Sequence, residues 1–338
     1  MAYEALRNRL EDGLDCRPIH ALPDGSVDHY YAVETPTGER IDTQQAFAER
    51  LADTDVRSLN LVPQTVRAGG EAVNAAIQID ALEEPVSLYG HLEAPELGPF
   101  PFETVSMGEP ATVHVLAFQR AELMLSVESG DINTWALSDL FETIEIEPDD
   151  WVADAVVLVQ NWVGFPAMTD AIEQLATVDL GESTVVFDPG DVTEASAVSL
   201  RELCAALSTL GDEVRVVLTG NDAELDRFAA VLDADSEAGC REARIRDAVD
   251  VAAVVRHAED VAVAAAEDVT TVENFEARAV SRRTGAGDRF DGGLAVGLAA
   301  GLDWEETLAL GNACASYYVD HDATATRADL IEMLTARI

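Results

Sequence analysis

Residues 285–302 read GAGDRFDGGLAVGLAAGL and carry the densest structural signal in the chain. Two glycines open the segment and a run rich in glycine and alanine follows, which predicts a tight turn leading into a closely packed helix. The flanking segments extend this pattern. ARAVS at 277–281 predicts a strand before the turn, and WEETLALGNACASYYV at 304–319 predicts a second helix after it.

The turn formed by Gly285, Ala286, Gly287 and Asp288 has the composition of a phosphoryl-binding site. Glycine lets the backbone approach a ligand closely, and the first N–H groups of the helix point into the same space at the positive end of its dipole. Asp288 would place a carboxylate there, able to accept the proton of an attacking hydroxyl. The alternative is a glycine turn whose Asp merely caps the helix.

A second motif runs from Asn221 to Glu224 and reads NDAE, directly after the apolar run VRVVLT at 214–219. Ligands of open α/β sheets gather at the carboxyl ends of the strands, so this position faces the expected crevice. Asn221 and Glu224 could order Mg²⁺ with its waters and the phosphates of a nucleotide. The same residues also fit a helix capping box, and both interpretations can hold together.

A third motif lies earlier, where Gly69 and Gly70 precede EAVNAAIQIDAL, which reads as a helix containing Asn74. Paired glycines at a helix start allow the backbone and an Asn side chain to meet a polar ligand such as a sugar hydroxyl. Without the other motifs, a loop entering an ordinary helix explains the pattern equally well. Asp28 follows an expected first strand, and by itself it gives no indication of function.

The region after residue 150 alternates short apolar runs with helical patterns. This rhythm predicts a parallel sheet covered by helices on both faces. The expected strands are 153–160, 183–188 and 214–219, and the expected helices are 167–176, 195–210 and 222–232.

The first 150 residues are richer in strand and turn signals. TVHVLAF at 112–118 and ELMLSVE at 122–128 can pair as antiparallel strands, and VDHYYAVE at 27–34 precedes the turn signal TPTGER, which suggests a hairpin. A helix is expected from Thr43 to Leu51. We therefore expect one α/β domain over residues 1–338 carrying a smaller β-rich projection.

The charge of the chain excludes several classes of function. Asp and Glu number 64 against 21 basic residues, all of them Arg, for a net charge of −43. So acidic a surface repels nucleic acid and anionic membranes and suits multimolar salt, which points to a halophilic source. Without lysine, the chain cannot form a G-x-x-x-x-G-K-[ST] loop, a protein-kinase ATP site or a Schiff base.

The chain carries no signal for export or membrane insertion. Its N-terminus lacks the apolar core of a signal peptide, and no uncharged apolar run approaches 18 residues. The four cysteines are scattered without a C-x-x-C pair, which argues against structural zinc and a disulfide framework. We expect a soluble, cytoplasmic protein.

The order and spacing of GG…N, N-x-x-E and GAGD resemble the PfkB/ribokinase family of carbohydrate kinases over roughly residues 20–335. The resemblance implies a three-layer α/β/α fold with a mostly parallel central sheet. It also implies a smaller β-sheet lid, here formed by segments at about 29–66 and 103–132, that covers the sugar and often forms a dimer interface. It therefore implies a homodimer through the lid.

The resemblance also assigns roles to individual positions. Asp288 matches the catalytic base, and Gly285, Ala286 and Gly287 match the anion hole for the transferring phosphoryl group. The other matches fall into three groups. Asp28, Gly69, Gly70 and Asn74 correspond to sugar-binding positions; Asn221 and Glu224 correspond to the motif acting on Mg²⁺ and phosphates; Thr284 and Asn312 fall on the nucleotide side, with Asn312 near the adenine.

Two departures from the family pattern concern cations and the nucleotide. Arg282 replaces an Asp that commonly helps to hold a cation, so we expect its guanidinium to supply the positive charge instead. The glycine loop T-x-G-x-x-G over the nucleotide is missing, because the matching stretch VVRHAEDVAVA at 254–264 has no glycine. ADP therefore stays open as the donor besides ATP.

The sequence thus predicts a Mg²⁺-dependent kinase that transfers the γ-phosphoryl group of ATP to a hydroxyl of a small sugar or sugar-like substrate. Arg67 beside the paired glycines and Arg282 beside GAGD make a sugar phosphate such as ribose 1-phosphate an alternative substrate, unless both arginines are solvated or paired with carboxylates. A further alternative is a non-catalytic regulator that binds a sugar or nucleotide on the same fold.

Overall fold

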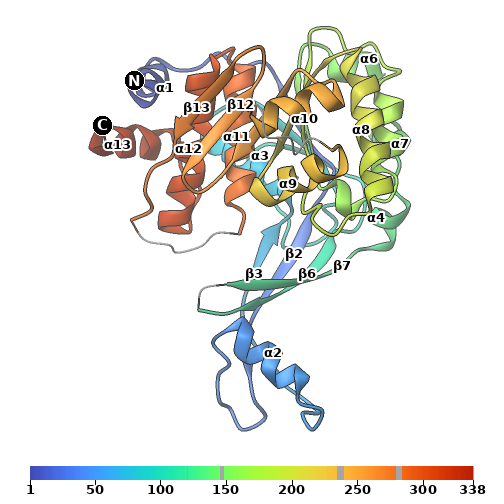
Figure 1. Cartoon of the computed structure of the whole chain (residues 1–338), viewed down its shortest axis with the longest axis vertical. Coiled ribbons are helices and arrows are strands. Elements are labelled where there is room, and N and C mark those ends of the chain that lie inside the picture. The colour runs from blue at the N-terminus through green and yellow to red at the C-terminus, as the bar shows by residue number, and fades with distance from the viewer. Residues whose placement is uncertain (120, 145–147, 234–239, 279–283, 338) are drawn as a thin grey trace.

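A computed structural model describes the chain except for residues 120, 145–147, 234–239, 279–283 and 338. The described residues form two sheets. A large sheet lies between two layers of helices, and a smaller sheet projects from the body (Figure 1). This is the three-layer architecture that the resemblance implies, with the smaller sheet in the place of the expected lid.

The large sheet has nine strands in the order β13-β12-β11-β10-β9-β8-β1-β4-β5. The seven strands from β11 to β5 run parallel, and β12 and β13 are antiparallel additions at one edge. Their bounds are β1 Ile19–Leu22, β4 Val86–Gly90, β5 Glu103–Ser106, β8 Val156–Gln160, β9 Thr184–Asp188, β10 Arg215–Gly220, β11 Ala253–His257, β12 Val261–Ala265 and β13 Val269–Glu273.

The strands bury side chains on both faces because each face is covered by helices. On β8, Val156 and Leu158 enter one core and Val157 and Val159 enter the other, as the period of two requires. The first core is covered by α1 Ala2–Asp12, α3 Glu71–Ala81, α11 Ala286–Ala299, α12 Trp304–His321 and α13 Arg327–Arg337. The second is covered by α5 Leu137–Ile144, α7 Met168–Leu175, α8 Ala197–Gly211, α9 Asp222–Val231 and α10 Arg241–Val249. Shorter elements are α4 Gly130–Thr134, α6 Pro148–Val152 and the 3₁₀ turn η1 Trp162–Gly164.

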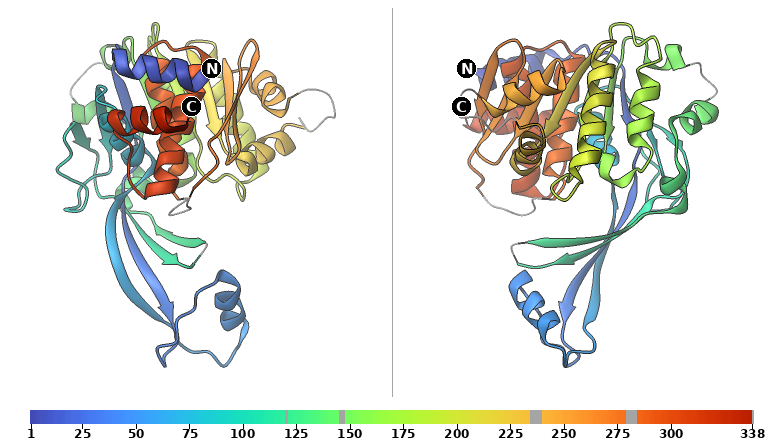
Figure 2. Two further views of the ribbon diagram at one scale, coloured as in Figure 1. Left: turned by 90° about the vertical axis from the view of Figure 1, so that its left-hand side faces the viewer. Right: turned by 45° about the vertical axis from the view of Figure 1, so that its right-hand side comes forward.

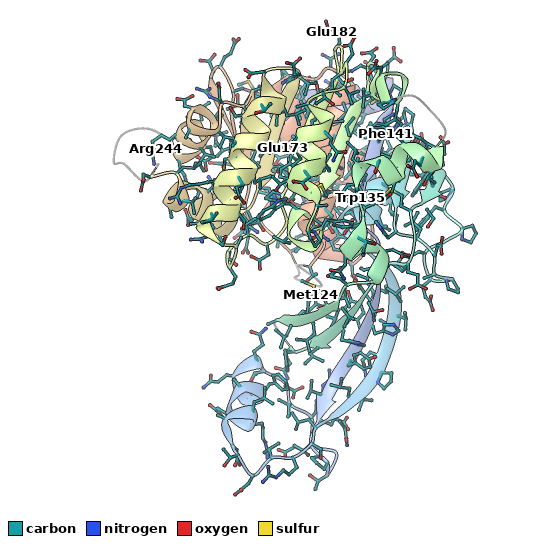
Figure 3. All side chains as sticks on the ribbon, turned by 90° about the vertical axis from the view of Figure 1, so that its right-hand side faces the viewer. Met124, Trp135, Phe141, Glu173, Glu182 and Arg244 are labelled. Carbon is teal, nitrogen blue, oxygen red and sulfur yellow. The ribbon has the colours of Figure 1, made fainter. Side chains whose placement is uncertain are left out.

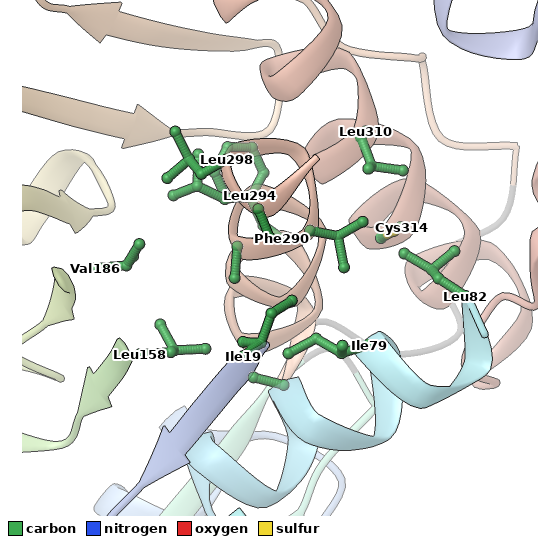
Figure 4. Close-up of a cluster of buried hydrophobic side chains, with 14 of the residues drawn as sticks. Ile19, Ile79, Leu82, Leu158, Val186, Phe290, Leu294, Leu298, Leu310 and Cys314 are labelled. Carbon is green, nitrogen blue, oxygen red and sulfur yellow. The ribbon is translucent and has the colours of Figure 1, made fainter. Parts of the chain in front are cut away.

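Helix α11 lies at the centre of the first core. Phe290 and Leu294 on this helix are fully buried (Figure 4). Gly293 and Gly311 let α11 and α12 approach closely, since a Cβ at Gly293 would lie 2.9 Å from the Cα of Gly311. The glycine-rich composition of 285–302 therefore reflects helix packing as well as the turn, and it fixes the start of α11 relative to the sheet.

The smaller sheet has the order β3-β2-β6-β7 and carries a helix at its tip (Figure 2). Its strands are β2 Ser26–Glu34, β3 Asn60–Gly69, β6 Ala111–Ala117 and β7 Glu122–Val127, and the helix is α2 Gln44–Ala52. Thr43 caps α2 by accepting the N–H of Ala46 at 3.1 Å. We call this sheet with α2 the lid.

Most expected elements are confirmed, including the antiparallel pair β6 and β7. The prediction of a hairpin directly after residues 27–34 is wrong, because the segment that follows this turn is not the strand that pairs with β2. The turn signal does fold the chain back, with one bridge between Glu34 and Arg40, but β2 pairs along its whole length with β3. Residues 277 and 278 of the strand expected at 277–281 are irregular, and 279–281 lie outside the described residues.

The two faces of the lid have different surroundings. Pairing between strands places Asp28, Arg67 and Ser126 on the face turned toward the body, together with Met124, which Figure 3 shows where the lid meets the body. The opposite face carries Val66, Leu125 and Val127 beside a group of aromatic rings. These rings belong to His29, Tyr31 and His114.

Charged side chains such as Glu173 and Glu182 project from the body into solvent (Figure 3). In the part of the chain that the structure describes, no helix combines the length and the apolar character needed to cross a bilayer.

Candidate active site

A cavity of about 930 Å³ lies between the lid and the body, at the carboxyl ends of the parallel strands. It brings together twelve of the fourteen predicted site residues. These are Asp28, Arg67, Gly70, Asn74, Asn221, Glu224, Thr284, Gly285, Ala286, Gly287, Asp288 and Asn312. Gly69 lies outside the lining, and Arg282 lies outside the described residues.

The glycine turn has the geometry expected from the sequence. Gly285 is the N-cap of α11 with φ 89° and ψ 2°, a backbone conformation that favours glycine. The amides of Ala286 and Gly287 follow at the free N-terminus of the helix, and both residues line the cavity. Asp288 lies in the first turn, where its Oδ2 accepts a hydrogen bond from Nδ2 of Asn74 at 2.7 Å.

The environment of Asp288 raises the pKa of its carboxyl to about 7. Burial is the main cause, and the negative charges of Asp188 and Asp24 add to it. Arg289 and the hydrogen bond from Asn74 act in the opposite direction. A carboxylate whose pKa is near neutrality can take up a proton during a reaction and release it again afterwards.

Asn221 and Glu224 form the capping box that the sequence allowed. The side chain of Asn221 accepts the N–H groups of Ala223 and Glu224, and Glu224 Oε2 accepts the N–H of Asn221 at 2.7 Å. Both side chains also line the cavity. Burial and the nearby Asp188 raise the pKa of Glu224 to about 8.

Two predicted ligand-binding residues are engaged with other parts of the protein. Arg67 forms a two-pronged ion pair with Asp322, with both N–O distances at 3.0 Å, which links the lid to α12. Asn312 is buried and donates to the carbonyl of Val272 at 3.2 Å, so it ties α12 to the edge of the sheet. Its side chain therefore supports the cavity wall.

Asp28 comes shortly after the first strand β1, as expected, but it is itself part of the next strand. It lies inside β2, where its Oδ1 accepts the hydroxyl of Ser26 at 2.6 Å. Gly69 lies on β3 opposite Ser26, diagonally across from Asp28, and a Cβ there would come within 2.4 Å of the Asp28 carboxylate. Gly69 is therefore needed to make room for Asp28.

The stretch 254–264, which lacks the glycine loop, forms part of a β-hairpin at the rim of the cavity. Strands β11 and β12 pair antiparallel across it. His257, Ala258 and Glu259 line the cavity from this hairpin, in the region that the missing loop was expected to occupy.

The sequence reasoning missed Asp24, which organises the start of α3. Its two carboxylate oxygens accept the N–H groups of Glu71 at 2.8 Å and Ala72 at 2.7 Å, and Nδ2 of Asn161 donates to it at 3.1 Å. These bonds anchor the helix that carries Asn74. The available signal was the turn sequence LPDG immediately after the first strand.

A polar group at the ends of strands β8, β9 and β11 was also not predicted from the sequence. Gln160, Asp188 and His257 are the last residues of β8, β9 and β11, and Asp291 faces them from α11. Asp291 is fully buried and accepts the hydroxyl of Thr219 at 3.0 Å. Burial and the neighbouring Asp188 hold the pKa of Asp291 well above its usual range. The signal was a polar residue closing an otherwise apolar strand, as in VVLVQ.

Comparison with known proteins finds relatives among sugar kinases. A model of the prokaryotic ketohexokinase family matches residues 27–336. A ketohexokinase from Haloferax volcanii is 27% identical over 303 residues, which cover 84% of this chain and 80% of that protein.

Solved structures with similar folds include three sugar kinases. A ribokinase from Thermotoga maritima superposes with a TM-score of 0.64 at 17% identity, covering 94% of this chain and 98% of the other. A fructokinase with bound ATP from Xylella fastidiosa gives 0.68 at 14% identity, covering 95% and 98%. A ribokinase from Arabidopsis thaliana in complex with ribose and ATP gives 0.64 at 20% identity, covering 95% and 99%.

Proposed function

The chain belongs to the prokaryotic ketohexokinase family, and from this premise we propose that it transfers the γ-phosphoryl group of ATP to a hydroxyl of a neutral ketohexose. Asp288 carries the proposal, because its carboxylate faces the cavity beside the amides of a helix N-terminus. We assign it as the base that accepts the proton of the sugar hydroxyl while the new bond to phosphorus forms.

The glycine turn is the proposed site of the transferring phosphoryl group. The free amides of Ala286 and Gly287 would donate to its oxygens, and this fixed array needs no rearrangement as charge develops. Asn74 orients Asp288 and lies on α3 beside the lid. We place the sugar between the lid and Asn74, with Asp28 binding a hydroxyl, so that the lid excludes water from the reaction.

We place ATP on the other side of Asp288, against α9, the β11–β12 turn and α12. Thr284 and Asn221 would face its phosphates. Oxygen ligands suit Mg²⁺, and Glu224 with the neighbouring Asp188 offers carboxylate oxygens. Bound Mg²⁺ would neutralise charge on the phosphates. Glu224, held by Asn221, would orient it.

The charge of the cavity favours a neutral sugar over a sugar phosphate. Ten carboxylates and two arginines, Arg67 and Arg289, line it among the described residues. Arg67 is already paired with Asp322, and the guanidinium of Arg289 lies 4.9 Å from the ring centre of Tyr318. The ten carboxylates belong to Asp24, Asp28, Glu71, Glu128, Asp188, Asp191, Glu224, Glu259, Asp288 and Asp322.

A substrate panel tests this proposal. In molar KCl with ATP and Mg²⁺, we expect kcat/KM for fructose to exceed that for ribose 1-phosphate by at least about tenfold, because a phosphate would enter a cavity dominated by carboxylates. Ribose and a nucleoside serve as neutral controls, and ADP replaces ATP in a parallel series. Preference for the sugar phosphate would contradict the proposal. Absence of turnover with every sugar would favour a binding protein without catalysis.

The acidic, lysine-free surface supports a cytoplasm with multimolar salt as the working environment. At such ionic strength the screening length falls to about 3 Å or less, and the mutual repulsion of the surface carboxylates is largely removed. ATP is available in the same compartment.

We further propose that two copies of the chain associate through the outer face of the lid. Val66, Leu125 and Val127 on that face are each about half exposed, at 47%, 49% and 58%. A sheet with one apolar face turned to water is an expected site of association. A second copy would cover this face with its own, as the isologous contact of a two-fold dimer requires.

Light scattering after gel filtration in molar KCl tests the association. The wild-type protein is expected to have twice the mass of one chain, and Val127→Asp is expected to shift it to the single-chain mass because the charge would be buried without a partner. Val198→Asp is the matched control, since Val198 is 64% exposed on α8, far from the lid. A monomeric wild-type protein would rule out this dimer.

A further inference from the structure

Beneath the glycine turn, three side chains suited to metal binding come together from distant parts of the sequence. One ligand atom each from Asp188, His257 and Asp291 lies within 4.8 Å of the others. Nitrogen and oxygen ligands bind divalent cations at about 2 Å, so opposite ligands stand about 4 Å apart. The three atoms thus need only a small contraction to bind one ion.

A fourth side chain contacts the same cluster. Gln160 is fully buried at the end of β8, and its Nε2 approaches Asp291 Oδ2 at 3.4 Å. Its amide oxygen is buried without a hydrogen-bond partner among the described residues, and so is Nε2 of His257. Buried polar atoms without partners are rare because each costs the hydration it has lost. These two atoms are therefore open to a further ligand or to water.

A shared proton or a bound cation would relieve the repulsion between the two carboxylates of the cluster, which water alone would not. Two carboxylates in contact repel each other unless a proton or a cation lies between them. A proton between Asp188 and Asp291 would relieve that repulsion but leave the imidazole nitrogen and the amide oxygen without partners. A cation can bind the carboxylate oxygens, the imidazole nitrogen and the amide oxygen at the same time.

We propose that Asp188, His257 and Asp291 bind one divalent transition-metal ion, with Gln160 as an additional oxygen donor. An imidazole combined with carboxylates favours Mn²⁺ or Zn²⁺ over Mg²⁺. Asp188 and His257 also line the cavity, which gives the ion a route of entry.

This site shares Asp188 with the place proposed for Mg²⁺ with ATP but differs from it in its other ligands. The protein supplies its ligands without any nucleotide, and Glu224 is not among them. A Cβ at Gly287 would lie 3.2 Å from His257 Cε1, so the cluster lies directly behind the anion-binding turn. A cation there adds positive charge beside the amides that face the transferring phosphoryl group.

The test uses the full chain, freed of metal with a chelator, in molar KCl that screens non-specific binding to the acidic surface. Mn²⁺ is titrated without nucleotide or sugar, and the free ion is followed by electron paramagnetic resonance. We expect one tight site per chain, and we expect Asp291→Asn and His257→Phe each to weaken it by at least about tenfold, since each removes a ligand. Co²⁺ in the same site would report its imidazole ligand through its visible spectrum.

Matched controls separate this site from general effects of the substitutions. Glu306→Gln neutralises a buried carboxylate on α12, and His20→Phe replaces a partly buried histidine stacked on Trp151; neither residue lines the cavity. Both variants should keep the wild-type affinity for Mn²⁺. His257→Phe decides the matter if Asp291→Asn fails to fold.

Binding of Mn²⁺ only after ATP is added would overturn the proposal, and so would equal affinity in the wild type and His257→Phe. Because the titration contains neither substrate, its outcome does not depend on the proposed reaction. A protein that binds Mn²⁺ here but fails to phosphorylate ketohexoses would refute the reaction alone.

Discussion

Asp288→Asn is expected to lower kcat for sugar phosphorylation by about a thousandfold, the typical contribution of a positioned general base. The amide keeps the size of the side chain and can still bond to Asn74, but it cannot accept the proton of the hydroxyl. KM for the sugar should change little, because the neighbouring Asp28 and Asn74 stay in place. Steady-state kinetics in molar KCl would measure both constants.

The same residue sets an expected pH dependence. Since the pKa of Asp288 is raised to about 7, kcat/KM of the wild type should fall as the pH drops through that value and the base becomes protonated. The stability of the folded protein depends on pH in the opposite direction to its activity. The folded protein favours the neutral carboxyl, so that contribution to the free energy of unfolding is present at low pH and lost as the pH rises through about 7. Above that pH, Asp288→Asn should be more stable than the wild type.

Asp303→Asn is the matched control for Asp288→Asn. Asp303 caps α12 by accepting the N–H of Glu306 at 2.8 Å, and it lies outside the cavity lining. Its substitution changes the same functional group at a helix start but should leave kcat and the pH profile unchanged. An Asp288→Asn enzyme with near-wild-type kcat would exclude the base assigned here.

The central architecture was predictable because it depends on local patterns. Strands buried on both faces read as continuous apolar runs, and the alternation with helices leaves few arrangements other than a parallel sheet. Helix α9 is an example. The run VRVVLT marks the strand, Asn221 and Glu224 mark the cap, and the structure confirms both.

The pairing in the lid was harder to predict because it depends on contacts distant in sequence. The turn after β2 looks like a hairpin, but 25 residues containing α2 separate Glu34 from its true partner strand, which begins at Asn60. Strand β3 is mostly exposed and carries polar residues, so its sequence has no apolar run to identify it. The partner of β2 follows from the three-dimensional arrangement alone.

The candidate site was predictable only where one segment contains the whole feature. The turn at Gly285–Asp288 and the capping box at Asn221–Glu224 are such segments. Asp24, Asp188 and Asp291 act together with residues more than 40 positions away, and nothing in their local sequence indicates a shared site. The ion pair of Arg67 with Asp322 spans 255 positions, which is why a paired arginine looked like one available to a substrate.

The second large effect is expected at Gly285, where Gly285→Ala should lower kcat by about a hundredfold, comparable to the loss of an oxyanion donor. A Cβ at this position would lie 3.4 Å from the hydroxyl of Tyr318 and 3.7 Å from Nδ2 of Asn74, which are ordinary contacts. Steric conflict with Tyr318 or Asn74 therefore does not oppose the alanine. With φ at 89°, an alanine is strained by about 1–2 kcal/mol, and relief of that strain would rotate the amides of Ala286 and Gly287 away from the phosphoryl group.

Gly301→Ala separates backbone strain from catalysis, because Gly301 follows the other end of α11 with φ at 64° and a Cβ there would meet nothing within 4 Å. Chemical denaturation should show a similar loss in the free energy of unfolding for both variants, about 1–2 kcal/mol. Only Gly285→Ala should lose kcat. Since strain of the same kind is introduced at both ends of one helix, a loss of kcat confined to Gly285→Ala would come from the orientation of the amides at its N-terminus. Equal kcat in the two variants would mean that those amides take no part in the reaction.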